Sequence, residues 1–210
     1  MPEGLTFEQA ALAEPLACVM NGQERVGVKL GDTVVVLGAG PIGILHVKLA
    51  RRAGARRIVV SEPSPLRRQA ALKAGADLAV DPTTEHLFER VLEASDGLGA
   101  DVVIVAIGVP ALANDAIRLA RPRGRISLFA GFSVGVHAEL DVNAIHYNEL
   151  TVTGSSGLSR LQFERSLNMI ASGHLEVESL LTHRFGLRDI QKALETAEHG
   201  SAIKVAIVGE

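Results

Sequence analysis

The sequence predicts an α/β fold in which a doubly wound parallel sheet of about six strands is flanked by helices. Short runs rich in Val and Ile alternate with longer segments rich in Ala, Leu and Arg. Near-continuous apolar runs indicate strands buried on both faces, as in a parallel sheet covered by helices. Three of the longer segments carry Pro at or near their first turn, where its missing N–H needs no partner, and this favours helix starts.

The elements are expected in a regular strand-helix order, joined by right-handed crossovers. A helix at about 14–23 precedes the first core strand. The expected strands are Thr33–Leu37, Arg57–Ser61, Asp77–Val80, Val102–Ala106, Arg125–Ala130 and Leu150–Thr153. The expected helices between them are Pro41–Ala53, Pro65–Ala74, Thr84–Ala94 and Pro110–Ala120.

The pattern changes beyond Gly154, where Ser155–Gly157 is loop-like. Two further helices, Leu161–Ser172 and Leu187–Glu198, and a final strand, Ile203–Val208, are expected to form a small piece of a second lobe. We therefore divide the chain into a helical interdomain segment (1–30), a sheet domain (31–155) and a C-terminal segment (156–210).

Composition favours a soluble intracellular protein. Apolar residues make up 47% and charged residues 21%, and the net charge of −3 gives no basic block for nucleic acid. The single cysteine, Cys18, cannot form an internal disulfide, which favours a reducing, cytoplasmic setting. The apolar stretches are too short to cross a membrane, and the acidic start does not resemble a signal peptide. Neither a nucleic acid nor a membrane is therefore expected as a partner.

The most specific motif is Gly38-Ala39-Gly40-Pro41-Ile42-Gly43, a GxGxxG set between a predicted strand and a predicted helix. Gly38 permits the tight turn, Gly40 lets the backbone approach a pyrophosphate, and Gly43 lets the helix pack closely on the sheet. The helix N-terminus offers free N–H groups and partial positive charge to phosphates. The motif in this context predicts a dinucleotide-binding Rossmann unit.

Glu62 follows the second predicted strand, nineteen residues after Gly43. A carboxylate there can bind both ribose hydroxyls of adenosine and repels a 2′-phosphate, so NAD is favoured over NADP. Arg67 and Arg68 lie nearby and could accommodate a 2′-phosphate. S-adenosylmethionine enzymes share a Gly-rich first turn and are the alternative reading of the binding site; two βαβ-like halves and the Pro in the turn favour a dinucleotide.

Taken together, several segments of the chain resemble the medium-chain dehydrogenase family. They are GDTVVVLGAGPIG, VVSEP with the following Arg, ADVVIVAIG, PRGRISLFAGF, NELTVTGS and LLTHRFGLRDIQKALE, and they cover essentially all 210 residues in order. The closest subgroup contains the zinc-type sorbitol, threonine and related polyol dehydrogenases. Its members bind NAD and a catalytic zinc between a Rossmann domain and a GroES-like catalytic domain.

The resemblance implies the cofactor contacts of this chain. Beside Gly38, Gly40 and Gly43 they would be Pro41, Ile42, Glu62, Arg67, Ala106, Ile107, Gly108, Ala130, Gly131, Phe132 and Lys204. The groups after the fourth and fifth strands also lie at carboxyl ends beside the switch point, where physical reasoning places a ligand. Lys204 can equally be read as a surface lysine on a terminal strand.

Glu14 is the one metal-site candidate, because Glu14-Pro15-Leu16 resembles a stretch that lies at the catalytic zinc in the polyol subgroup. Its alternative role is that of an acid at a helix start, favoured there by the helix dipole. The Cys and the Gly-His-Glu motif that complete the zinc site in the family are not found here, nor is any CxxC or HxxxH spacing. We therefore assign no catalytic residue and expect negligible turnover by these 210 residues alone, without the GroES-like domain.

The favoured function is the NAD-binding portion of a zinc-dependent oxidoreductase that transfers hydride between an alcohol or polyol and NAD. Two alternatives stay open: a non-catalytic NAD(H)-binding module, and a zinc-free medium-chain quinone or enoyl reductase. Family members are dimers or tetramers, and residues 137–140 (HAEL) form a short segment that could pair across a two-fold axis. A homodimer or homotetramer is therefore expected.

Overall fold

The computed structural model describes residues 1–209, which fall into two compact units. The larger unit comprises Val19–Gly157. The smaller comprises Met1–Cys18 and the described residues from Leu158 onward. Within the described residues, every helix falls short of the length and apolar character that crossing a bilayer requires.

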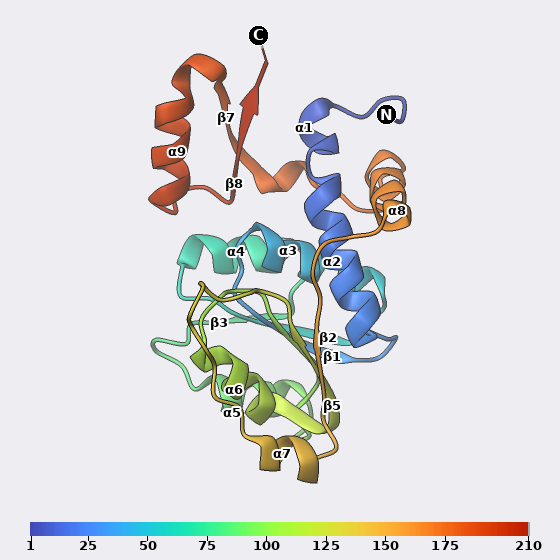
Figure 1. The fold of residues 1–210 in the computed structure, drawn as a ribbon, viewed down its shortest axis with the longest axis vertical. Coiled ribbons are helices and arrows are strands. Elements are labelled where there is room, and N and C mark those ends of the chain that lie inside the picture. Colours follow the sequence, from blue (N-terminus) through green and yellow to red (C-terminus); the bar gives the residue numbers. More distant parts are fainter. Residues whose placement is uncertain (210) are drawn as a thin grey trace. The chain divides into compact units, whose positions relative to one another are not determined.

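The larger unit contains a six-stranded, fully parallel sheet in the order β3-β2-β1-β4-β5-β6 (Figure 1). The strands are β1 (Thr33–Leu37), β2 (Arg57–Ser61), β3 (Leu78–Val80), β4 (Ala100–Val105), β5 (Ala120–Leu128) and β6 (Thr151–Gly154). The order reverses between β1 and β4, which pair in register from Val34↔Val102 to Leu37↔Val105. This confirms the predicted doubly wound Rossmann sheet.

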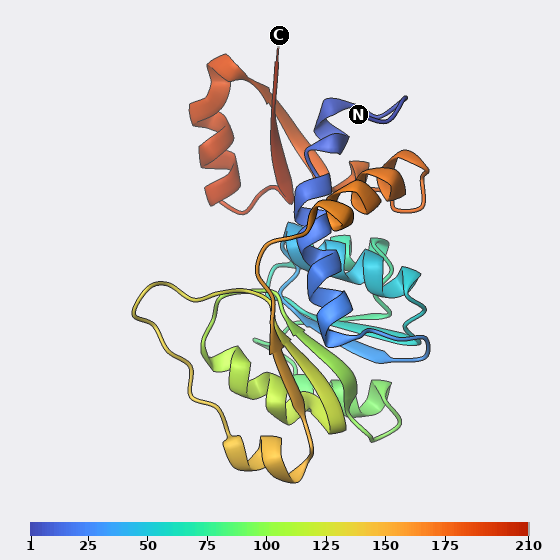
Figure 2. The same cartoon turned by 45° about the vertical axis from the view of Figure 1, so that its right-hand side comes forward.

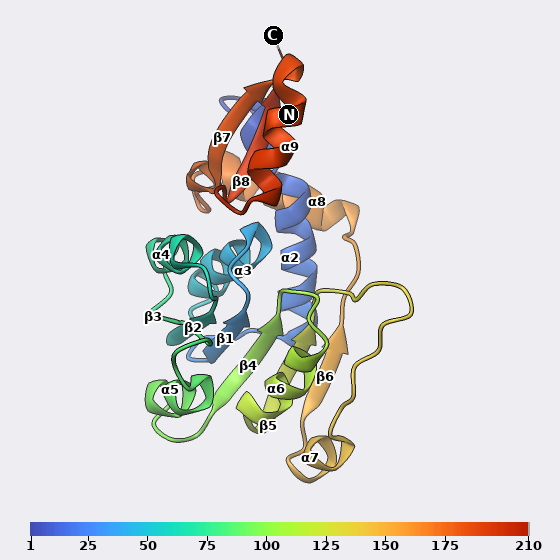
Figure 3. The same cartoon turned by 90° about the vertical axis from the view of Figure 1, so that its left-hand side faces the viewer.

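Helices cover both faces of this sheet, α3 and α4 on one side and α5 and α6 on the other (Figures 1 and 3). The helices of the unit are α3 (Pro41–Arg52), α4 (Pro65–Lys73), α5 (Leu87–Ala94), α6 (Ala111–Leu119) and α7 (Val142–Tyr147). Helix α2 (Ala13–Val26) spans the boundary between the units. Every residue of β1 is buried because alternate side chains pack under each helical layer.

The smaller unit is built around a βαβ unit with two parallel strands. Strands β7 (Leu181–Gly186) and β8 (Lys204–Val208) flank helix α9 (Ile190–Glu198). Helices α1 (Phe7–Ala10) and α8 (Arg160–Ala171) and two 3-10 turns, η1 (Glu178–Leu180) and η2 (Leu187–Asp189), complete it. Both α1 and α8 begin with a capping box, Thr6 with Gln9 and Ser159 with Gln162.

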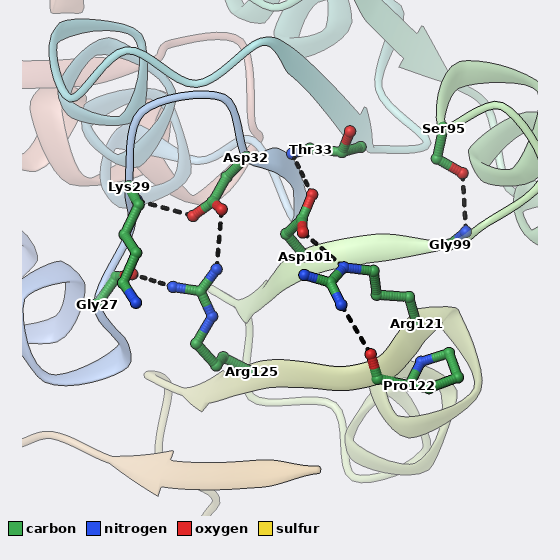
Figure 4. Close-up of polar contacts among 10 residues, drawn as sticks. All are labelled: Gly27, Lys29, Asp32, Thr33, Ser95, Gly99, Asp101, Arg121, Pro122 and Arg125. Carbon is green, nitrogen blue, oxygen red and sulfur yellow. Dashed lines mark hydrogen bonds and ion pairs between the residues drawn. The ribbon is translucent and has the colours of Figure 1, made fainter. Parts of the chain in front are cut away.

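Ion pairs tie together the amino ends of β1, β4 and β5 (Figure 4). Asp32 accepts from Arg125 at 2.8 Å, and Arg125 also donates to the carbonyl of Gly27. Asp101 accepts from Arg121 at 2.6 Å and from the N–H of Thr33 at 2.8 Å. These contacts fix the amino-terminal edge of the sheet, opposite to the edge at which the strands end.

Several elements differ from expectation, among them the unexpected strand β7. Helix α5 begins at Leu87 rather than Thr84, because the carboxylate of Asp81 binds the N–H of Thr83 and holds residues 81–85 in a turn. Strand β5 begins at Ala120, with a register shift against β4 in place of the expected loop. The short α7 after the long 131–140 segment (Figure 2) was not expected; Asp141 caps it by accepting from the N–H of Ala144.

Candidate functional site

The glycine-rich turn lies between β1, which ends at Leu37, and α3, which begins at Pro41. Gly38 has φ +96°, a conformation that favours glycine, and its N–H donates to the carbonyl of Ser61 at 2.8 Å. A Cβ on Gly38 would lie 3.1 Å from Cβ of Ile107. The first glycine therefore lets the turn fit between the ends of β2 and β4.

The other two glycines differ in their surroundings. A Cβ on Gly43 would lie 2.0 Å from the carbonyl oxygen of Gly38, so the helix could not pack against the turn with any side chain there. A Cβ on Gly40 would meet no atom within 4 Å. Packing requires the third glycine, whereas the second glycine faces open space.

The N-terminus of α3 is open to an anion. Gly40 is its N-cap and provides no side-chain cap, and Pro41 occupies the first turn. The first N–H groups of a helix have no partner within the helix, and they carry partial positive charge. A phosphate group would satisfy these donors without displacing a capping side chain.

Glu62 directly follows β2, and only 3% of its surface is exposed. One carboxylate oxygen, Oε2, accepts from the N–H of Ala39 at 2.8 Å, and the other, Oε1, accepts from the N–H of Ser64 at 3.0 Å. The carboxylate thus links the glycine turn to the start of α4. Each carboxylate oxygen can accept more than one hydrogen bond, so ribose hydroxyls could still bind.

The two arginines after Glu62 differ in their contacts. Arg68 donates to the carbonyl oxygens of Glu62 and Pro63 and forms an ion pair with Asp81 at 3.0 Å. Hydrogen bonds from Thr83, and then the charge of Arg68, lower the pKa of Asp81. Arg67 instead lines a pocket, and its buried Nε has no partner among the described residues. Arg67 is therefore the arginine available to a ligand.

This pocket has a volume of about 740 Å³ and opens beside the turn. Gly38, Glu62, Arg67 and Ile107, all predicted cofactor contacts, lie in its wall. Apolar side chains from α5, from the loop after β4 and from α6 also line it, among them Leu87, Val109 and Leu112. Sequence reasoning missed these apolar residues, because only the tertiary fold brings α5 and α6 to the pocket.

The loops after β4 and β5 meet at the same edge of the sheet. The N–H of Ala106 donates to the carbonyl of Leu37 at 2.9 Å, and that of Ala130 donates to the carbonyl of Val105 at 3.0 Å. A Cβ on Gly108 would lie 2.6 Å from the carbonyl oxygen of Gly131. The predicted contacts 106–108 and 130–132 are thus neighbours. Pro41 and Ile42, also predicted contacts, lie in the first turn of α3.

Two predicted site residues, Lys204 and Glu14, lie in the smaller unit. Lys204 is the exposed first residue of β8. Glu14 is exposed in the first turn of α2 and accepts a hydrogen bond from Cys18 Sγ at 3.3 Å. Burial, together with the neighbouring carboxylate, raises the pKa of the Cys18 thiol to about 11, so the thiolate that binds metals well is disfavoured.

The part of the chain that the structure describes lacks a complete set of zinc ligands. No three His, Cys, Asp or Glu side chains within residues 1–209 gather into a group that could hold a metal ion. A catalytic zinc requires three protein ligands, and Glu14 with a protonated Cys18 supplies fewer. The described residues therefore fit a dinucleotide but not a catalytic metal.

Comparison with known proteins points to one family. The family model for zinc-binding dehydrogenases matches residues 41–172. The chain is 32% identical over 211 residues to an L-threonine 3-dehydrogenase of Pyrococcus furiosus and 31% identical over 212 residues to a sorbitol dehydrogenase of Halalkalibacterium halodurans. Each alignment covers 99% of this chain but 60% of the relative, so the chain spans about 60% of the length of these curated relatives.

Among solved structures of similar fold, one is complexed with NADH and another is bound to NADP. A short chain alcohol dehydrogenase of Escherichia coli CFT073, complexed with NADH, is 28% identical with a TM-score of 0.87, over 94% of this chain and 58% of that one. A protein of Sinorhizobium meliloti 1021, named as a zinc-binding dehydrogenase and bound to NADP, is 30% identical with a TM-score of 0.91. That match covers 99% of this chain and 61% of the other.

Proposed function

The chain belongs to the zinc-binding dehydrogenase family, and from that premise we propose that it forms the cofactor-binding part of an NAD-dependent alcohol or polyol dehydrogenase. The observation that carries the proposal is the open glycine turn: Gly40 faces empty space at an uncapped helix start, and the buried carboxylate of Glu62 lies beside it. This combination suits a pyrophosphate joined to an adenosine ribose.

Each residue group has a distinct role in this proposal. The N–H groups at the start of α3, near Gly40 and Pro41, would bind the pyrophosphate, and Glu62 would accept hydrogen bonds from the adenosine ribose. The apolar wall formed by Ile107, Val109 and Leu112 would exclude water from the adenine. The loops 106–108 and 130–132 would support the nicotinamide half.

The nicotinamide, when bound, supplies the hydride chemistry, and the chain provides binding and orientation. The proposed substrates are alcohols and polyols. Two curated relatives are named for sorbitol, which is a polyol, and for threonine, which carries a secondary alcohol. Since no three His, Cys, Asp or Glu side chains among the described residues form a complete zinc site, we assign these residues no step in the activation of the substrate.

We favour NAD over NADP for the same site. The Glu62 carboxylate is fixed by two backbone N–H groups and would repel a 2′-phosphate placed next to it. Arg67, which lines the pocket, is the residue that could instead attract a 2′-phosphate. The buried carboxylate is hydrogen-bonded to the turn itself, and this supports NAD.

Self-association through one edge of the sheet is the proposed assembly, as a dimer or tetramer. Strand β6 is the last strand of the sheet, so one side of its backbone is free to pair. The segment before β6, which contains the predicted pairing residues 137–140, also carries the exposed apolar side chains Val134, Val136 and Val142. Sedimentation should give a multiple of the chain mass, and a Val134→Asp, Val136→Asp double variant should be monomeric; a monomeric parent chain would contradict this assembly.

Dinucleotide binding can be tested with NADH fluorescence, because the chain contains no tryptophan that would interfere. NADH emission should rise on titration with the protein, and NAD should reverse the rise. S-adenosylmethionine, the other adenosine cofactor that uses a Gly-rich turn, should not compete. Failure of NADH to bind, or competition by S-adenosylmethionine at equal concentration, would overturn the proposal.

A further inference from the structure

His46 is a fully buried histidine on α3, one turn after Gly43, and it lies outside the proposed cofactor contacts. Its exposed fraction is 0%, although histidine is rarely so enclosed without a partner. The ring contacts side chains from two other segments of the larger unit, Gln23 on α2 and Phe129 after β5. These three residues form what we call the His46 cluster.

Gln23 fixes the orientation and protonation of the His46 ring. Gln23 Nε2 donates to the backbone carbonyl of His46 at 2.8 Å, and a carbonyl can only accept, so the amide orientation is determined. The same nitrogen lies 3.3 Å from His46 Nδ1; if Nδ1 accepts, the ring proton is on Nε2, which has no hydrogen-bond partner among the described residues. Burial lowers the pKa of His46 to about 3, so the ring is neutral at physiological pH.

Phe129 is held between the two helices. Its ring meets the His46 ring edge-to-face, with centroids 4.6 Å apart and planes at 87°. On the α2 side, a Cβ on Gly22 would lie 2.7 Å from Cδ2 of Phe129. The absence of a side chain at Gly22 therefore lets α2 approach this ring closely.

Phe129 directly precedes the segment Ala130–Phe132, which we call the β5 exit loop. The N–H of Phe129 donates to the carbonyl of Val105 at 3.2 Å, and that of Ala130 donates to the same oxygen at 3.0 Å. The β5 exit loop then passes Gly108 so closely that no Cβ fits there. Strands β4 and β5 lie on the opposite side of β1 from Glu62, where the second half of a dinucleotide must extend.

We propose that His46 is a positioning residue for the nicotinamide half of the dinucleotide, acting through Phe129 to fix the β5 exit loop without touching the cofactor. This inference rests on the proposed dinucleotide binding. A site must be held within a fraction of an ångström, and packing of its supporting side chains provides that precision. Loss of the ring contact should therefore weaken contacts to the nicotinamide half and leave the adenosine half, held by Glu62, unaffected.

The test compares NADH with AMP, which contains only the adenosine half. Calorimetry on the whole chain should show that His46→Leu weakens NADH binding about five-fold while AMP binding stays within about two-fold. Gln23→Met, which removes the amide that orients the ring, should act in the same direction and serves as the second variant if His46→Leu does not fold. Ile58→Val, at the amino end of β2, is the matched core control and should not alter the ratio of the two affinities.

The outcomes separate this proposal from the one on which it depends. If the parent chain binds neither NADH nor AMP, both proposals fail. If the parent binds both ligands and neither His46→Leu nor Gln23→Met changes the NADH-to-AMP ratio, the His46 proposal alone is wrong. An equal loss of both affinities, as expected from a general structural defect, would likewise overturn it.

Discussion

The Glu62 carboxylate accepts a hydrogen bond from the backbone N–H of Ala39 at 2.8 Å, and this bond joins the end of β2 to the glycine turn. The same carboxylate accepts from the N–H of Ser64. Glu62 therefore has two tasks that different substitutions can separate. It holds the backbone of the turn through hydrogen bonds, and it carries the charge that would distinguish NAD from NADP.

Substitution of Glu62 should separate these tasks. Glu62→Gln keeps an acceptor for Ala39 but removes the charge, so preference for NAD over NADP should fall by about tenfold, equivalent to about 1.4 kcal/mol. Glu62→Ala also removes both acceptors and should lower the free energy of unfolding by about 2 kcal/mol. Calorimetry and denaturant titration measure the two effects. An unchanged preference in Glu62→Gln would show that the charge does not select the cofactor.

Gly43 and Gly40 should respond to alanine in opposite ways. Gly43→Ala places a Cβ 2.0 Å from the carbonyl oxygen of Gly38 and should destabilise the chain by about 1–3 kcal/mol through overpacking. Gly40→Ala meets no atom within 4 Å and should leave the stability nearly unchanged, yet weaken NADH binding because the methyl group occupies the proposed phosphate space. Unaltered NADH affinity in Gly40→Ala would contradict the assignment of this space.

The sequence was informative where the signal was local. The bounds of β1 and β2 were predicted to the residue, because uninterrupted apolar runs specify buried strands. The turn and Glu62 were identifiable because motif spacing follows from the chain path between β1 and β2. Helix α1 was missed, although its Thr6–Gln9 capping box was a readable signal.

Contacts made by the folded chain were not predictable. Gln23 and His46 are 23 residues apart, and nothing in either segment indicates that one orients the other. Leu112 joins the pocket only because the crossover brings α6 beside it. Glu14 and Cys18 are four residues apart, one helical turn, but the raised pKa of Cys18 depends on burial that the sequence does not reveal.

The pH dependence of stability should carry a contribution from His46. Its pKa in the folded chain is about 3, below the ordinary value of 6.5, so between these values the unfolded chain binds one more proton than the folded chain. Stability should therefore fall as the pH drops from 6.5 toward 3, by roughly 1.4 kcal/mol per pH unit from this group. In urea titrations at several pH values, His46→Leu should show a shallower slope; parallel curves for the two proteins would contradict the buried neutral ring.

The two ion pairs at the amino end of the sheet should differ in their contributions. The Asp32 and Arg125 side chains are only 9% and 16% exposed, so Arg125→Met leaves a largely buried carboxylate unpaired and should cost about 3–5 kcal/mol. Arg121 is 35% exposed, and Arg121→Met should cost about 1 kcal/mol. Thermal unfolding compares them, and equal losses would contradict the role of burial. The dinucleotide affinity of Arg121→Met should not change, because the pair lies at the edge of the sheet opposite to the proposed dinucleotide site.

The most direct test of the central claim is calorimetric titration of the 210-residue chain with NAD and with NADP. NAD should bind saturably, and the affinity for NADP should be lower by about tenfold or more, equivalent to about 1.4 kcal/mol. Binding of neither dinucleotide would contradict the assignment of the Gly38–Gly43 turn as a pyrophosphate site. Tighter binding of NADP would retain the turn but show that Arg67, rather than Glu62, determines the choice of cofactor.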